Sequence, residues 1–514
     1  MQENTKKMKN IKYYISVLAA MTLLCSCEDL LDSYPESEVS ADEYITSTAA
    51  LNSTVLGCYN VMQGVLQYEW AVTELRTDNT RLYGAGSTSN TTKALEYLDQ
   101  GNIPSSSEYV NDYWDSSYAG IARCNLVLEK LGVADDEALR AQFEAEAKFL
   151  RAHFYFNLIR LWGPVFLVTK TTSAEEARYM QRTPVDDVYA LIEGDLETIV
   201  ASEALPVKYD ADQTGRATRV AAAALLAKVY MTHYELGDDK YAKAAELLED
   251  VIEWVGNPAS GSDLVPFDKV FSIDNEMNDE IIFTCRYMSG NQGLGSPFGN
   301  YFAPINNGAN VIAGNANANN YPSNDIINAF NANEGDLRKD VSLRERYWNA
   351  QTGVWVETGT CRYVNKFMSP VTVNYDGESD WPIIRVGDVV LLYAEILNEL
   401  QGPSEKALGY LNMTRQRAGI PSLTLAEVGS KYLFREAVRT ERRLELAFEN
   451  HRFFDLLRWG IATETINDSF AVKDADYYAT YSYVINPIED WQLRLPIPQS
   501  VKDINPDVAQ NVGY

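Results

Sequence analysis

Apolar residues recur every three or four positions over long parts of the chain, the spacing of a helix with one buried face. In 141–162 this stripe consists of Phe143, Ala147, Leu150, Phe154, Leu158 and Leu161. Gly163 and Pro164 follow, and this pair predicts the end of that helix. An alanine-rich segment at 217–236 predicts a second helix, which a neighbour can approach closely. A turn at 237–239 leads to a third helix, with a stripe from Tyr241 to Val255.

Antiparallel helix pairs joined by short turns predict a tetratricopeptide-like stack, in which each pair buries its apolar face against the next. The repeat signature is degenerate, so the prediction rests on the helical pattern rather than on a clean period. Helical periodicity returns at 385–400, continues at 407–418 and again runs from Phe434 to Trp459. We therefore expect a mostly α protein.

The segment 257–380 has a different pattern. Helical periodicity fades there, residues 280–287 read as a strand, and 288–322 is rich in Gly, Asn, Ser and Pro. A loop-rich stretch of this length in a compact protein is either disordered or functional. The tail from Pro487 to Tyr514 contains too much proline for a helix, and the alternation in 492–495 predicts a short strand.

The first 27 residues resemble a bacterial lipoprotein signal. Four lysines precede an apolar run at 13–24, which is about half of the ~20 residues that a membrane-spanning helix needs. Small residues then lead to Cys27, which we interpret as the lipidated residue, with Cys25 as the rival acceptor. An ordinary signal peptide is the alternative. We expect a signal peptide at 1–26, a lipid-anchored tether at 27–50 and several acyl chains holding the protein to the membrane.

Composition narrows the set of ligands. The formal net charge is −28, so the surface repels nucleic acid and offers no basic patch to anionic headgroups. A neutral or cationic ligand suits it better, although solubility alone also explains much of the acidity. Four further cysteines lack metal-like spacing and are interpreted as small buried hydrophobes: Cys58, Cys124, Cys285 and Cys361.

Several motifs together carry a resemblance to a known family. They are the runs 441–460 (ERRLELAFENHRFFDLLRWG), 147–156 (AKFLRAHFYF), 161–164 (LWGP), 387–398 (GDVVLLYAEILN), 411–419 (LNMTRQRAG) and 495–498 (LPIP), with Asn505-Pro506 and the final 510–514 (QNVGY). In this order, over nearly the whole chain after the signal, they resemble the SusD/RagB family.

The resemblance implies a SusD-like fold, with a helical part at 51–256 and a second part at 257–514 that contains a ligand-binding insertion at 286–322. It implies a lipoprotein of the outer membrane that faces the extracellular medium and touches the membrane only through its lipid. Family members cap a SusC-like TonB-dependent transporter as a lid and present oligosaccharide to it, or in RagB-like branches peptide. No cofactor, metal or catalysis is expected.

A surface glycoside hydrolase is the enzymatic alternative. Glu441, Glu445 and Glu449 have the spacing of one helix face, and two carboxylates can serve as acid and base. Arginines are interleaved with them, however, and a guanidinium lowers the pKa of a carboxyl, which is wrong for a general acid. We therefore predict a buried ion network, which also takes in Asp455, Arg458 and Trp459. The three histidines lack partners at metal-ligand spacing.

Glycan binding requires aromatic rings for the apolar faces of the sugar and polar side chains for its hydroxyls. Two predicted loops, 79–104 and 286–321, offer both, and the resemblance implies that the ligand binds there. The predicted ligand-binding residues are Tyr83, Asn90, Tyr97, Arg286, Tyr287, Asn291, Tyr301 and Phe302. Ordinary loop packing is the alternative for each of them. Trp70, Trp114 and Trp381 are predicted to lie in the core.

Overall fold

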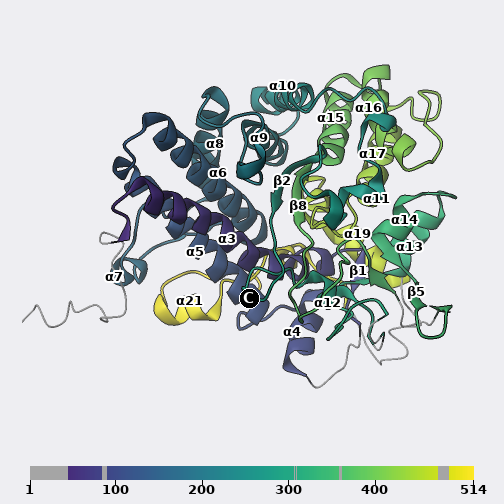
Figure 1. The fold of residues 1–514 in the computed structure, drawn as a ribbon, viewed down its shortest axis with the longest axis horizontal. Helices are drawn as coiled ribbons and strands as arrows, with labels where there is room; N and C mark the ends of the chain where they lie inside the picture. Colours follow the sequence, from purple (N-terminus) through teal and green to yellow (C-terminus); the bar gives the residue numbers. More distant parts are fainter. Residues whose placement is uncertain (1–43, 84–88, 306, 308–309, 358–361, 473–485) are drawn as a thin grey trace, which may run out of the picture.

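The computed structural model describes residues 44–83, 89–305, 307, 310–357, 362–472 and 486–514. A long array of helices occupies the upper and left parts of Figure 1, and the loop-rich segment lies along its lower right edge. The predicted signal peptide, Cys27 and Cys361 lie outside the described residues. The first described long helix begins at Thr48, within the segment expected to be a tether.

The N-terminal half consists mainly of long helices that pack side by side in chain order, as the tetratricopeptide-like prediction expects. They are α3 (Thr48–Val72), α4 (Asn90–Asp99), α5 (Glu108–Glu129), α6 (Glu137–Trp162), α7 (Ala174–Ala177), α8 (Val185–Ala201), α9 (Arg219–His233) and α10 (Asp239–Trp254). Helices α3, α5, α6, α8, α9 and α10 form one continuous series of contacts. The mostly helical fold is thereby confirmed.

Local chemistry explains where these helices begin and end. The Asp136 carboxylate accepts the Leu139 N–H at the start of α6, and the Thr218 hydroxyl accepts the Ala221 N–H at the start of α9. Gly163 ends α6 with a φ of 73°, a conformation that favours glycine. The alanines of α9 are buried, so this helix packs closely against its neighbours.

The C-terminal helices continue the same array. They are α15 (Val386–Gln401), α16 (Glu405–Arg417), α17 (Lys431–Glu445), α18 (Arg452–Arg458), α19 (Ala462–Val472) and α21 (Gln499–Ile504). Helix α15 packs against α10, so the array continues directly past the intervening segment. Short 3₁₀ helices connect the elements: Glu74–Arg76, Leu131–Val133, Ala211–Gln213, Gly261–Asp263, Ile273–Asn275 and Asp490–Leu493.

The segment between α10 and α15 carries short helices and strands. The helices are α11 (Phe267–Val270), α12 (Phe298–Phe302), α13 (Asn324–Asn331) and α14 (Arg338–Ser342). With β1 (Thr80–Arg81), the strands are β2 (Ile281–Cys285), β3 (Tyr321–Pro322), β4 (Leu343–Arg344), β5 (Arg346–Asn349), β6 (Val354–Glu357), β7 (Tyr363–Val364) and β8 (Trp381–Arg385). They pair antiparallel as β1–β3, β2–β8, β4–β7 and β5–β6 within the described chain.

The predicted helix from Phe434 to Trp459 is wrong as a single element. Helix α17 ends at Glu445, and α18 begins at Arg452. Between them Phe448 and Asn450 have φ values of 68° and 66°, which no α-helix accommodates. The Lys366 ammonium donates to the Ala447 carbonyl at 2.9 Å, so a distant side chain satisfies the backbone of this break.

Two further predictions need correction. The alternation at 492–495 forms no strand, because its first two residues, Gln492 and Leu493, belong to the 3₁₀ helix Asp490–Leu493. The proline-rich tail still contains a helix, α21. The expected loop at 79–104 contains α4, a ten-residue helix. Among the described residues, no helix is long and apolar enough to span a membrane. Cys58, Cys124 and Cys285 are buried free thiols, as predicted.

Candidate functional site

Strand pairing brings the two predicted ligand-binding segments together. Thr80 lies opposite Pro322 and Arg81 opposite Tyr321, although 242 and 240 positions separate the members of the two pairs. The Ser323 N–H donates to the Asn79 carbonyl at 2.9 Å, and the rings of Tyr83 and Tyr321 lie 5.3 Å apart. The pairing of β1 with β3 therefore brings segments from both halves of the chain side by side, with the paired residues themselves buried.

The predicted site residues divide into three groups by exposure. Asn90, Tyr97, Arg286 and Asn291 are exposed, Tyr83 and Tyr301 are half-buried, and Tyr287 and Phe302 are buried. Asn90 and Tyr97 lie on helix α4 rather than in a loop. The eight residues therefore do not form a single patch of accessible side chains.

The placement of Tyr287 and Phe302 corrects the prediction that they face a ligand. Tyr287 is 4% exposed because the alternation of β2 continues past its end and turns Cys285 and Tyr287 inward. Its ring lies 5.7 Å from that of Phe298. Phe302 is fully buried on the inner side of α12, with its ring 5.6 Å from that of Trp70. Both side chains are core residues that pack beneath the exposed ones.

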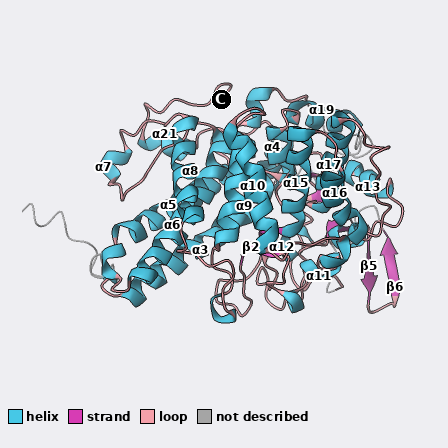
Figure 2. Cartoon of the chain, turned by 90° about the horizontal axis from the view of Figure 1, so that it is seen from above, coloured by secondary structure: helices cyan, strands magenta, loops and turns pink. Residues whose placement is uncertain are grey.

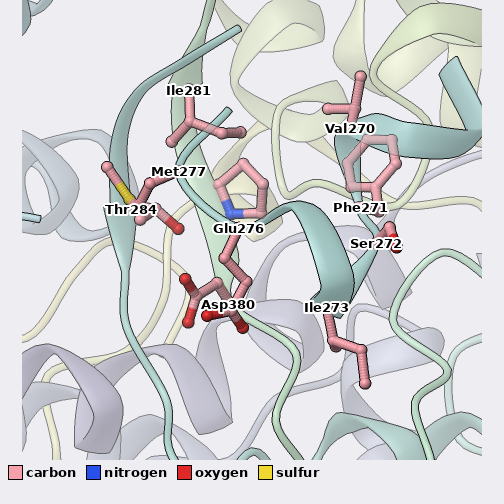
Figure 3. Close-up of a pocket in the computed structure, with 10 residues that line it drawn as sticks. Val270, Phe271, Ser272, Ile273, Glu276, Met277, Ile281, Thr284 and Asp380 are labelled. Carbon is pink, nitrogen blue, oxygen red and sulfur yellow. The ribbon is translucent and has the colours of Figure 1, made fainter. Parts of the chain in front are cut away.

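Arg286 is held by internal partners. Its guanidinium lies 2.8 Å from a Glu276 carboxylate oxygen and 2.6 Å from one of Asp380. Figure 3 shows the Glu276 and Asp380 side chains close together at one end of a small pocket. The pocket volume is about 20 Å³, which is room for a water molecule rather than a sugar.

Three alternating carboxylates fix the loop that follows Arg286. Asp380 accepts the Tyr287 N–H at 2.8 Å, and Glu378 accepts the Ser289 N–H at 3.0 Å. Asp376 accepts the N–H groups of Gly290 and Asn291, both at 2.8 Å. These carboxylates thus accept the backbone N–H groups that would otherwise donate to a neighbouring strand. This explains how an irregular glycine-rich loop keeps a defined shape.

The first prediction concerns the pH dependence of this loop. Burial raises the pKa of Asp380 to about 7, although Arg286 and the Tyr287 N–H oppose the rise. Because the folded pKa exceeds the unfolded value of 3.8, the stability that Asp380 contributes is present below pH 4. It is lost progressively up to about pH 7 and is constant above that.

Asp380→Asn mimics the protonated, neutral carboxyl, so its stability does not fall as the pH rises from 4 to 7. We expect the variant to gain stability relative to the wild type between pH 4 and pH 7, measured by urea unfolding at several pH values. Asp279→Asn, at an exposed carboxylate on the same segment, is the matched control. A difference between Asp380→Asn and wild type that does not change with pH contradicts this account.

Four tyrosines from separate segments form a further cluster near α12, which we call the tyrosine face: Tyr68, Tyr109, Tyr301 and Tyr375. The rings of Tyr68 and Tyr109 lie 5.9 Å apart, and those of Tyr301 and Tyr375 lie 5.6 Å apart. Trp70 is fully buried and joins the two pairs, at 6.2 Å from both Tyr109 and Tyr301. All four tyrosines are half-buried, so each ring keeps an accessible part.

The phenol groups of the tyrosine face lie close enough to influence one another. Burial raises the pKa of Tyr68 to about 12, with the Asp112 carboxylate and the Tyr301 phenol adding to the rise. Burial also raises the pKa of Tyr109, and Tyr301 contributes again. These hydroxyls are therefore neutral at physiological pH and can donate and accept hydrogen bonds.

Asparagine side chains hold the tyrosine face in place. The fully buried Asn300 accepts the Tyr375 N–H at 2.8 Å and donates to the carbonyl of Asn315 at 2.6 Å. Tyr375 has a φ of 62°, which is uncommon for a residue other than glycine and marks a locally strained backbone. The Asn317 amide lies 3.4 Å from the Tyr375 hydroxyl. Polar groups therefore border the rings.

The sequence prediction included Tyr301 but not the other three tyrosines of this face. Tyr68 lies on α3 and Tyr109 on α5, outside both loops that were predicted to bind the ligand. Tyr375 follows β7 in a loop outside both predicted segments. A possible signal was the position of Tyr68 and Tyr109 near helix ends, where one edge of a packing ring reaches the surface.

The carboxylates of the 441–460 run form a buried ion network, as predicted, with partners from other elements. Glu445 contacts the guanidinium groups of Arg338, Arg385 and Arg417. Burial alone raises the pKa of Glu445, but these three arginines hold it well below its usual range. The other pairs of the network include Glu449 with Arg385 and Lys366, Arg442 with Asp388 and Asp455, and Arg458 with Glu395 and Asp455.

Two models of known protein families each match one part of the chain. The model of the SusD family matches residues 339–514. A second model, described as starch-binding and associating with the outer membrane, matches residues 29–231. The chain belongs to the SusD/RagB family. The resemblance drawn from the sequence motifs is thereby confirmed.

Similar proteins cover this SusD/RagB chain almost completely. A SusD-like protein of Formosa agariphila is 27% identical over 99% of this chain and all of its own length. A SusD homologue of Bacteroides thetaiotaomicron has a solved structure that is 25% identical, with a TM-score of 0.77 over 93% of this chain and 99% of its own. A laminarin-binding SusD-like protein is also 25% identical, with a TM-score of 0.73 over 91% of this chain and all of its own.

Proposed function

We propose that this protein captures glycans and that the tyrosine face is its binding site. The observation that carries the proposal is the convergence of four half-buried tyrosine rings from four separate segments above the buried Trp70. Core packing alone does not require rings from distant segments to share one partly exposed surface. Asn300 and the strained Tyr375 backbone indicate that this arrangement is maintained at some energetic cost.

The chemistry of the face matches that of a sugar. A tyrosine ring offers an apolar surface for the C–H face of a pyranose, and its hydroxyl offers a hydrogen bond at the edge. The Asn317 amide and the Asp112 carboxylate lie beside these rings and are suited to sugar hydroxyls. Membership of the SusD/RagB family and the laminarin-binding relative support a glycan as the ligand.

We further propose that the protein delivers its glycan to a SusC-like TonB-dependent transporter in the outer membrane. In this proposal acyl chains on Cys27 hold the protein to the outer leaflet, and the protein serves as a lid that faces the extracellular medium. The family description, which names association with the outer membrane, supports this location. A lid fixed over its transporter raises the local ligand concentration, so modest affinity is enough.

We propose binding without bond cleavage. A glycosidase needs one carboxyl that stays protonated near neutral pH beside a second that is ionised. Burial raises the pKa of Glu445 and Glu449, yet their arginine and lysine partners bring it below the usual range, so neither is a general acid. Both side chains are also buried, out of reach of a polymer.

Calorimetric titration with a panel of soluble glycans, including laminarin, tests the function. We expect at least one glycan to bind, no products to form, and Tyr301→Ala to weaken binding more than Tyr83→Ala does, because Tyr83 packs on Tyr321 outside the tyrosine face. Release of reducing ends points to a hydrolase instead. Co-purified peptides, with no glycan bound, point to a peptide-capturing lid.

A further inference from the structure

A two-stranded hairpin, β5–β6, projects from the body of the protein at the right edge of Figure 2. It carries two tryptophans, Trp348 and Trp355, which are 46% and 45% exposed. They are direct cross-strand partners, and their rings meet edge to face at 5.7 Å. Two adjacent exposed tryptophans on a projecting ribbon mark an interaction site, because exposing large apolar rings to water costs free energy that a bound partner would recover.

Register places charged groups on the same side of the ribbon as the tryptophans. Arg346 pairs across the strands with Glu357, two positions from the Trp348–Trp355 pair, so all four side chains share one face. The Arg346 guanidinium lies over the Trp355 ring at 4.7 Å and 3.6 Å from a Glu357 oxygen. The face therefore combines aromatic and cationic groups.

This face borders a groove of about 760 Å³ that also reaches α14 and β4. Four cations line the groove, Lys339, Arg344, Arg346 and Arg362, against three carboxylates, Asp340, Glu345 and Glu357. The excess of positive charge is local, since the chain as a whole has a formal net charge of −28. A cationic groove on such an acidic protein favours an anionic ligand.

The pairing inside the groove leaves cationic capacity for a ligand. Glu345 lies 3.1 Å from the Lys339 ammonium and 3.9 Å from the Arg362 guanidinium, so one carboxylate serves two cations. Nε of Arg344 donates to the backbone carbonyl of Asp340 at 3.3 Å, and a neutral carbonyl does not offset its charge. A guanidinium whose positive charge is not offset by a carboxylate can bind the carboxylate or sulfate of a ligand through two parallel hydrogen bonds.

We propose that the hairpin and its groove form a second glycan-binding site, specific for acidic polysaccharides that carry sulfate esters or uronate carboxylates. Trp355 stacks on a sugar ring, and Arg344 with its neighbours binds the anionic substituent. The site is separate from the tyrosine face, and it stands or falls independently of the proposal for that face.

The shape of the hairpin favours a polymer over a membrane surface. The tryptophans lie in the middle of the strands, whereas the turn consists of Ala350, Gln351, Thr352 and Gly353. A ribbon that inserts into lipid is expected to carry its apolar rings at the tip. The Ala350 N–H donates to the side chain of the loop residue Asn310 at 3.2 Å, so the turn is joined to a neighbouring loop.

Calorimetric titration with three polymers tests the site: polygalacturonate for carboxylates, dextran sulfate for sulfates, and laminarin as the neutral reference. The wild type is expected to bind one or both acidic polymers, more weakly as salt rises. Trp355→Ala and Arg344→Gln are each expected to weaken that binding at least tenfold. Which acidic polymer binds identifies the anionic group, and any laminarin binding at the tyrosine face is unaffected.

Val354→Ala is the matched control, because Val354 is 53% exposed on the opposite face of the same hairpin. Circular dichroism of each variant confirms that the fold is retained. Failure of the wild type to bind either acidic polymer overturns the proposal. If Trp355→Ala binds as tightly as the wild type, the proposal is also overturned, because non-specific electrostatic attraction then explains the binding. Binding to phosphatidylethanolamine–phosphatidylglycerol vesicles that depends on Trp355, without polymer binding, assigns the hairpin to a membrane instead and likewise overturns it.

Discussion

Glu445→Gln is expected to lower the free energy of unfolding by about 3–5 kcal/mol, the usual cost of removing one partner from a buried ion pair. Glu445 is fully buried, and its carboxylate contacts three arginines. Glutamine has nearly the same shape but leaves these buried guanidinium groups with one negative charge fewer. The network joins α14, α16, α17 and β8, so we expect the loss to appear in global unfolding, measured by urea denaturation.

Glu144→Gln provides the control for this effect. Glu144 also pairs with a cation, Lys148, but on the exposed face of α6 and one turn away. Such a pair contributes a few tenths of a kcal/mol. A Glu445→Gln variant as stable as Glu144→Gln means that the arginines have other sufficient partners and that the network does not stabilise the fold.

Tyr301→Ala combined with Tyr375→Ala is expected to weaken glycan binding by roughly 10- to 100-fold, the range of an aromatic hot spot that contributes about 1.4–2.8 kcal/mol. The two rings contact one another, and Tyr301 also packs against Trp70, so their loss removes one side of the tyrosine face. Affinity for the tightest-binding glycan of the panel is the measurement. Tyr301→Phe keeps the ring and is expected to lose much less.

Tyr179→Ala is the matched control for a lost tyrosine, because Tyr179 is 73% exposed and follows α7, away from the tyrosine face. Thermal unfolding of each variant separates lost affinity from lost structure. An affinity of the double variant within twofold of the wild type assigns glycan binding to another surface.

The helical pattern predicted α6, α9, α10, α15 and α16, because apolar residues recur at helical spacing in each of them. The pattern did not locate α3, α5 or α8. It failed at 446–451, where the left-handed Phe448 and Asn450 break the helix. Carbonyls there are satisfied by Lys366 and Arg385, side chains distant in the sequence, and no local pattern contains that information. Helix α4 was missed for a different reason: only Leu95, Leu98 and Asp99 are buried in it, which is too few for a clear apolar stripe.

The site was predictable only in part. Residue types identified Tyr301 and the segment around Tyr83, but burial of Tyr287 and Phe302 depends on which side of a short element faces the core. Tyr68 and Tyr109 look like packing residues in the sequence, and they join the tyrosine face because α3 and α5 bring their ends beside α12. Surface positions that depend on tertiary contacts between distant segments cannot be read from periodicity.

The central claim is that a glycan binds on the tyrosine face, and hydroxyl-radical footprinting with and without a saturating glycan tests it most directly. Mass spectrometry then gives the oxidation rate of each tyrosine. We predict that the glycan lowers the oxidation of Tyr301 and Tyr375 and leaves the exposed Tyr179 and Tyr432 unchanged. Unchanged oxidation of Tyr301 and Tyr375 at saturation contradicts the claim.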